Sequence, residues 1–152
     1  MTAAERLRGE IAIELEHCRA IRQTILETLA LAESRPLTTL EMAGASSLLM
    51  QCYYSFENIF KRILRYYNLP MPTGDTSHFQ LLTLFATQHD VLPFLVTDDI
   101  RLRMSQLRKV RHVIIHGYSH ALEPERIFVA LRECPPVFER FSENIGQFLG
   151  NV

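Results

Sequence analysis

Apolar residues recur at alternating intervals of three and four over residues 42–66, and this spacing constrains the fold more than any other feature of the sequence. The stripe consists of Met42, Ala45, Leu49, Cys52, Phe56, Ile59, Ile63 and Tyr66. Such intervals place side chains on one face of an α-helix, whereas a strand would need alternation with period two. A second row widens this face, namely Tyr53, Phe60, Leu64 and Tyr67. We therefore expect a helix at the centre of a bundle or in a dimer interface.

The same periodicity predicts the other helices. Apolar residues recur at helical spacing over three further segments, about residues 2–33, 76–88 and 98–116. A capping box, in which the side chains of Thr38 and Glu41 each bond the other residue's backbone amide, predicts the start of the long apolar helix. Pro124 opens a last helical segment, which we expect Pro135 and Pro136 to break or kink. The sequence therefore predicts an all-α, up-and-down bundle of four or five helices.

Finer features of the third and fourth helices can also be predicted. Phe79, Leu82 and Phe85 repeat at intervals of three and should face the core. Thr97 is expected to cap the fourth helix. Gly117 should end it, because glycine readily adopts the backbone conformation of a helix C-cap.

The length and composition are those of one folded domain. The chain has 152 residues, of which 47% are apolar and 22% charged, and it has no low-complexity tract. These values allow a core of its own and argue against disorder. The N-terminus lacks an apolar signal region, and no apolar run approaches the roughly 18 residues of a membrane span. We therefore expect a single domain over residues 1–152 in a cytoplasmic protein.

Charge and cysteine content exclude several classes of protein. The net charge of −1 argues against a strongly basic nucleic-acid-binding protein. Arginine nevertheless outnumbers lysine 14 to 2, and arginine suits bidentate contacts with phosphate. Genomic composition is, however, the simpler explanation of that excess. The three cysteines are widely spaced and form no C-x2-C unit, so we expect buried thiols rather than a zinc site or a disulfide framework.

The segment RHVIIHGY, residues 111–118, carries polar residues that helix packing does not require. In a chain with 14 arginines and 6 histidines, an arginine five positions before a histidine is common by chance; the added Tyr118 makes the triple with Arg111 and His116 much rarer. Histidine can transfer protons near neutral pH, and arginine can hold a phosphate by two hydrogen bonds. Metal-independent RNA cleavage needs a base for the 2′-hydroxyl, an acid for the 5′-oxygen and positive charge near phosphorus.

The spacing of the motif raises a geometric question. Five residues correspond to about 140° of rotation on an ideal helix, so Arg111 and His116 do not share a helix face. They converge only if the helix loosens near Gly117 or if a second subunit supplies a partner. A symmetric dimer would bring two of each, and the wide apolar face of residues 42–67 offers an interface for it. His78 would line the same site if its segment folded over the fourth helix.

Other interpretations of these residues stay open. The H-x3-H spacing of His112 and His116, extended by His120, resembles a metal-binding pattern. Gly117 should, however, end the helix before His120, and no glutamate follows His112 as in metalloproteases. We therefore expect no metal site, and nothing in the sequence calls for a cofactor. Taken alone, each motif residue is typical of a solvated, capping or packing position, so a purely structural helical protein is a further alternative.

The block LRKVRHVIIHGYSHALEPERI resembles the signature segment of HEPN-domain proteins, and specifically of HepT-type toxins, whose motif is R-x4-H-x-Y with a polar residue after the arginine. Two further segments, CYYSFENIFKRILRYYNLP and SHFQLLTLF, resemble the second helix of that family and the segment after it. The resemblance covers nearly the whole chain. It implies a helical bundle that forms homodimers, in which arginine and histidine of both subunits line an RNA-cleaving cleft.

The resemblance also implies roles for individual residues. Arg111 and His116 would be catalytic, His112 a supporting polar residue, and Tyr118 the site to which a minimal nucleotidyltransferase antitoxin transfers AMP. The expected function is that of a metal-independent endoribonuclease toxin in a type VII-like toxin–antitoxin pair, with RNA as substrate. The alternative is a non-catalytic HEPN module that binds a nucleotide or a nucleotidyltransferase partner.

Overall fold

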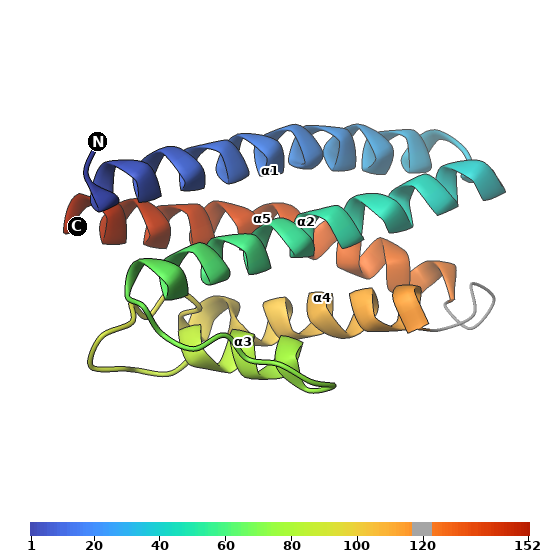
Figure 1. Cartoon of the computed structure of the whole chain (residues 1–152). Coiled ribbons are helices and arrows are strands. Elements are labelled where there is room, and N and C mark those ends of the chain that lie inside the picture. Colours follow the sequence, from blue (N-terminus) through green and yellow to red (C-terminus); the bar gives the residue numbers. More distant parts are fainter. Residues whose placement is uncertain (117–122) are drawn as a thin grey trace.

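The chain folds into five α-helices, with no strand in the part that the computed structural model describes, residues 1–116 and 123–152 (Figure 1). The helices are α1 (Ala3–Ser34), α2 (Thr39–Tyr66), α3 (Ser77–Phe85), α4 (Asp98–His116) and α5 (Pro124–Gly150). The four long helices run alternately up and down, and both chain ends lie at one end of the bundle. The predicted all-α bundle is confirmed. No helix within the described residues is long and apolar enough to cross a membrane.

α2 occupies the centre of the bundle and contacts each of the other four helices. Phe60 stacks on Phe85 of α3 with ring centroids 4.5 Å apart, and it meets Phe141 of α5 edge-on at 5.5 Å. Only two large apolar side chains of α2 are exposed, Leu40 and Tyr54. The wide apolar face of α2 is therefore covered within one chain. It explains internal packing and no longer supports the expected dimer interface on α2.

Capping boxes start both of the first two helices. The Thr38 hydroxyl accepts the Glu41 amide proton at 3.1 Å, and the Glu41 carboxylate accepts that of Thr38 at 2.9 Å, as predicted. Arg35 donates two hydrogen bonds of 2.8 Å to the same carboxylate. The hydrogen bond from Arg35 is the largest cause that lowers the pKa of Glu41 to about 2. An equivalent box of Thr2 and Glu5, which the sequence analysis did not include, starts α1.

α5 continues as one helix through Pro135 and Pro136, so of the two expected outcomes, a break or a kink, the break is wrong. A proline inside a helix removes a backbone hydrogen bond and costs about 3 kcal/mol. Here the apolar face stays buried on both sides of the prolines, at Leu131 and Cys134 before them and at Phe138 after them. Packing of this face against the bundle offsets the lost hydrogen bonds. The axis of α5 changes direction in its orange part, which includes the prolines (Figure 1).

α3 is shorter than predicted and is rotated so that Phe79 points outward. Leu81, Leu82 and Phe85 are buried, whereas the Phe79 side chain is 54% exposed, so the prediction of a core position for Phe79 is wrong. The Arg108 guanidinium of α4 lies over the Phe79 ring, 5.4 Å from its centroid. Phe79 therefore contacts a cation on α4, an arrangement that is favourable by about 0.5–1 kcal/mol at exposed sites.

The N-terminal half of α4 is fixed to α5. The Thr97 carbonyl accepts the Arg101 amide proton at 3.0 Å, which puts Thr97 at the predicted start of the helix. Arg140 of α5 donates to the Asp99 carboxylate at 2.8 Å, and Asn144 donates to the Leu95 carbonyl at 2.9 Å. These contacts fix the direction of α4. The motif residues at the opposite end of α4 are thereby placed relative to α2 and α3.

The three cysteines are buried, as predicted, and none forms a disulfide. Cys52 of α2 and Cys134 of α5 face each other across the core, with sulfur atoms 2.8 Å apart. Burial raises the pKa of the Cys18 thiol to about 12. Neutral thiols in an apolar core act as small packing groups.

Candidate active site

The described motif residues lie in the last two turns of α4. Arg111 is half-buried, and both His112 and His116 are exposed. α4 is a regular helix through His116, so it does not loosen between Arg111 and His116. The rings of His112 and His116, one turn apart, have centroids separated by 4.6 Å. The two histidines form an exposed pair, and the helix geometry places Arg111 on a different face.

Arg111 is directed toward α3 instead, where it meets His78. The distance from Arg111 Nη1 to His78 Nε2 is 3.4 Å. His78 Nδ1 lies 2.6 Å from an oxygen of Glu57, on α2. α3 therefore covers this part of α4, which was the condition under which the sequence analysis expected His78 to line the site. One line of polar contacts joins α2, α3 and α4.

A partly buried polar cluster surrounds this line of contacts, and we call it the Glu57 cluster: Tyr53, Glu57, His78, Arg108 and Arg111. The Glu57 side chain is only 1% exposed. Its second carboxylate oxygen, the Tyr53 hydroxyl and Nε of Arg108 are buried without a hydrogen-bond partner in the described part of the chain. Burial, with the nearby Glu57 carboxylate as a second cause, raises the pKa of Tyr53 well above its usual range. Tyr53 is therefore a neutral hydroxyl beside these charges.

Glu57 is the residue of this cluster that sequence reasoning missed. The second apolar row of α2 steps from Tyr53 to Phe60, an interval of seven that leaves one helical position unfilled. Glu57 lies in that gap, four residues after Tyr53 and three before Phe60. A carboxylate at an apolar register position indicates a buried charge, and buried charges are paired. This signal predicts a partner for Glu57, although only the fold identifies it as His78.

The remaining motif positions fall outside the described residues. These are Tyr118, the expected modification site, Gly117, the expected end of α4, and His120 of the alternative metal pattern. In residues 1–116 and 123–152 there is no group of three His, Cys, Asp or Glu side chains that could hold a metal ion. The site as described thus consists of Arg111 and its buried support, with the exposed pair of His112 and His116.

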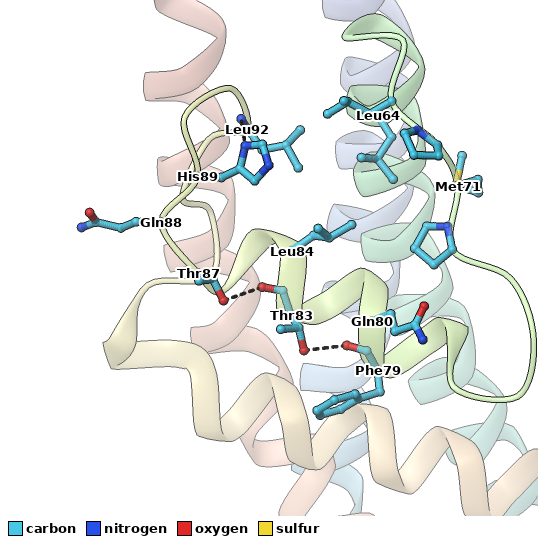
Figure 2. A pocket seen from close by; sticks show the side chains of 13 residues that line it. Leu64, Met71, Phe79, Gln80, Thr83, Leu84, Thr87, Gln88, His89 and Leu92 are labelled. Carbon is cyan, nitrogen blue, oxygen red and sulfur yellow. Dashed lines mark hydrogen bonds between the residues drawn. The ribbon is translucent and has the colours of Figure 1, made fainter.

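An apolar pocket of about 630 Å³ lies on the other side of α3, between α3 and the segments that flank it (Figure 2). Thr83 and Thr87 line it, but each donates its hydroxyl proton to the backbone carbonyl of the residue four positions earlier, at 2.8 Å (Figure 2). His89 accepts the amide protons of Val91 and Leu92 through Nδ1. Most polar groups of the pocket therefore serve the local fold, and the pocket offers mainly apolar contacts.

Comparison with known proteins identifies the family. The model of the HepT-like protein family matches residues 44–152, which include α3, α4 and α5 and most of α2. No curated protein and no solved structure matches the chain. The matched region contains the Glu57 cluster and the whole R-x4-H-x-Y motif. The chain therefore belongs to the HepT-like family.

Proposed function

We propose that this chain is a metal-independent endoribonuclease, the toxin of a type VII-like HEPN/nucleotidyltransferase toxin–antitoxin pair. Membership of the HepT-like family suggests a HEPN-type ribonuclease toxin in general. The observation that carries the finer proposal is the end of α4, where a half-buried arginine and an exposed histidine belong to one R-x4-H-x-Y motif. Arg111 and His116 are the residues to which we assign the chemistry.

In the proposed reaction the RNA itself supplies the nucleophile. The 2′-oxygen attacks the adjacent phosphorus while a base accepts its proton, and the bond from phosphorus to the 5′-oxygen breaks as an acid protonates that oxygen. The products are a 2′,3′-cyclic phosphate and a 5′-hydroxyl. His116 is the acid–base residue, and Arg111 stabilises the charge that develops on the phosphate oxygens. His112, whose ring is tilted by 46° to that of His116, is the supporting polar residue.

A complete site requires a second copy of the chain. Arg111 and His116 lie on different faces of a regular helix, and the scheme above needs both a base and an acid. In a homodimer, His116 of each chain would serve one of these roles. The dimer is tested by mixing parent and His116→Ala chains and demonstrating subunit exchange. Because a mixed dimer keeps only one His116, we expect activity to fall with the square of the parent fraction, whereas a fall in simple proportion to the parent fraction contradicts a shared site.

The cleavage itself is tested with purified protein and total cellular RNA in the presence of EDTA. We expect the parent to degrade the RNA, and Arg111→Ala and His116→Ala each to be slower by about 100-fold or more. Matched controls are the exposed Arg103→Ala on the same helix and His17→Ala on α1, which should cleave like the parent. Degradation that persists in His116→Ala contradicts the assignment. Nucleotide binding without turnover of any RNA would favour a non-catalytic module instead, an alternative consistent with the near-neutral net charge.

We assign the silencing of this activity to transfer of AMP onto Tyr118 by a minimal nucleotidyltransferase antitoxin. AMP on Tyr118 would add negative charge and bulk two residues from His116, which would repel and block an RNA phosphate. Incubation with such an enzyme and ATP should add one AMP to the parent, as measured by mass spectrometry, and should stop cleavage. Tyr118→Phe should accept no AMP and stay active. Labelling of Tyr118→Phe would contradict the assignment.

A further inference from the structure

Glu57 is a charged residue at a position that packing alone would fill with an apolar side chain. It lies in the apolar row of α2, beside Tyr53 and Phe60, both of which are completely buried. A buried ion pair is often no more stabilising than apolar residues of similar volume. Stability therefore gives no reason for this carboxylate. The contacts of Glu57 lead, through His78, to Arg111.

The hydrogen-bond chemistry of these groups defines one direction along the chain of contacts. The Arg111 guanidinium can only donate, so Nε2 of His78, 3.4 Å from Nη1, must carry a lone pair. In a neutral imidazole the proton is then on Nδ1. Nδ1–H points to the Glu57 carboxylate 2.6 Å away, which can only accept. The three residues thus form a line in which Arg111 donates to His78 and His78 donates to Glu57.

Resting on the function proposed above for Arg111, we propose that Glu57 and His78 are positioning residues that orient the Arg111 guanidinium for the RNA phosphate. The His78 ring uses one donor of the guanidinium and leaves its other donors for a phosphate. Glu57 holds the ring in the required tautomer, in the way that second-shell carboxylates fix histidine ligands of metals. The hydrogen bond between His78 and Arg111 is long, at 3.4 Å. It therefore favours one orientation of the guanidinium without immobilising it.

The other members of the cluster play different parts. Tyr53 is a neutral hydroxyl next to Glu57, and Arg108 lies over the Phe79 ring. Neither has a hydrogen bond to His78 in the described structure. The positive charges of Arg108 and Arg111 together face the single negative charge of Glu57. His78 is the group through which Glu57 reaches the motif arginine.

A double-mutant cycle tests the proposal by kinetics. If His78 acts through Arg111, His78→Ala should lower kcat/KM for RNA cleavage about tenfold in the parent and less than about twofold in Arg111→Ala. Glu57→Gln, which keeps an acceptor oxygen but loses the charge, should show the same non-additivity. His89→Ala is the matched control, because within residues 1–116 and 123–152 His89 bonds backbone amides of its own loop and no residue of the Glu57 cluster. Any effect of His89→Ala should be equal in both backgrounds. A tenfold loss from His78→Ala that persists in Arg111→Ala overturns the proposal.

A second measurement is independent of catalysis. Side-chain 15N NMR of the histidines in the parent, at pH 8, should show His78 as the Nδ1–H tautomer, with its Nε2 signal shifting in Arg111→Ala. Nε2–H or doubly protonated His78 would overturn the proposal. The two tests separate the possible failures. If the parent cleaves no RNA, the proposed function fails, and the NMR result still decides whether Glu57, His78 and Arg111 form the line of contacts.

Discussion

Removing His78 while keeping Glu57 should destabilise the fold more than removing both residues. Glu57 is 1% exposed, and His78 is its hydrogen-bond partner in the described structure. Removing the hydrogen-bond partner of a buried charge costs about 3–5 kcal/mol, because the charge stays desolvated without a partner. The His78 side chain is itself 35% exposed, so water can reach part of the vacated space. We therefore expect the lower end, about 3 kcal/mol, for His78→Leu.

The double variant Glu57→Leu/His78→Leu should recover most of this loss. Both partners are then apolar, no carboxylate is left buried without its partner, and replacement of both members of a buried pair by apolar groups is often neutral. We expect the double variant within about 1 kcal/mol of the parent, with the lost Arg111 contact accounting for part of the difference. The second substitution should thus restore free energy of unfolding that the first one removes, whereas two independent packing losses would simply add.

The assay is equilibrium unfolding in urea at one fixed protomer concentration, because dimerisation would make the apparent stability concentration-dependent. Arg103→Leu is the control. Arg103 is exposed on α4 and makes no side-chain hydrogen bond in the described structure, so its replacement should change the free energy of unfolding by less than about 0.5 kcal/mol. The reasoning is refuted if His78→Leu is as stable as the parent. It is also refuted if the double variant is no more stable than His78→Leu.

Four further predictions concern the framework that holds the site. Phe60→Ala should lower the free energy of unfolding by about 3–5 kcal/mol, measured in urea, because it removes the ring that packs on Phe85 and Phe141; a loss below 1 kcal/mol would contradict this packing. Thr38→Ala should lower the free energy of unfolding by about 1 kcal/mol, because it removes the N-cap of α2. The folded-state pKa of Glu41 is lowered to about 2, so its contribution to the free energy of unfolding is complete above the ordinary value of 4.5 and is lost as pH falls toward 2. Glu41→Gln should therefore make the free energy of unfolding depend less on pH across that range. An unchanged pH dependence would refute this linkage. The Cys18 thiol should react with a thiol reagent only after unfolding, since burial raises its pKa to about 12, and rapid labelling of the native protein would show otherwise.

The sequence predicted the helices well because their signals are local. The stripe of α2, the capping box at Thr38 and the start of α5 at Pro124 all depend on residues within one or two turns. The continuity of α5 through Pro135 could not be predicted in this way. It depends on burial of the helix face by other helices, which outweighs the local cost of the prolines.

The site was predictable only in part for the same reason. The motif in α4 is readable as a pattern, and so is the helical rotation that separates Arg111 from His116. Which neighbour Arg111 meets depends on how α3 crosses α4, and that crossing is a tertiary property. The gap that Glu57 fills in the apolar row was visible in the sequence, but its connection to His78 was not. The apolar width of α2 was misassigned in part to a dimer interface, because periodicity does not say what covers a helix face.

The chemistry of the cleaved RNA ends tests the central claim most directly. A defined RNA oligonucleotide would be incubated in EDTA with the parent, with His116→Ala and with Arg111→Ala, and the product ends identified by mass spectrometry. We expect 2′,3′-cyclic phosphate and 5′-hydroxyl ends from the parent, and little product from either variant. Products with 3′-hydroxyl ends, or equal amounts of product from all three proteins, would contradict a nuclease site built on Arg111 and His116.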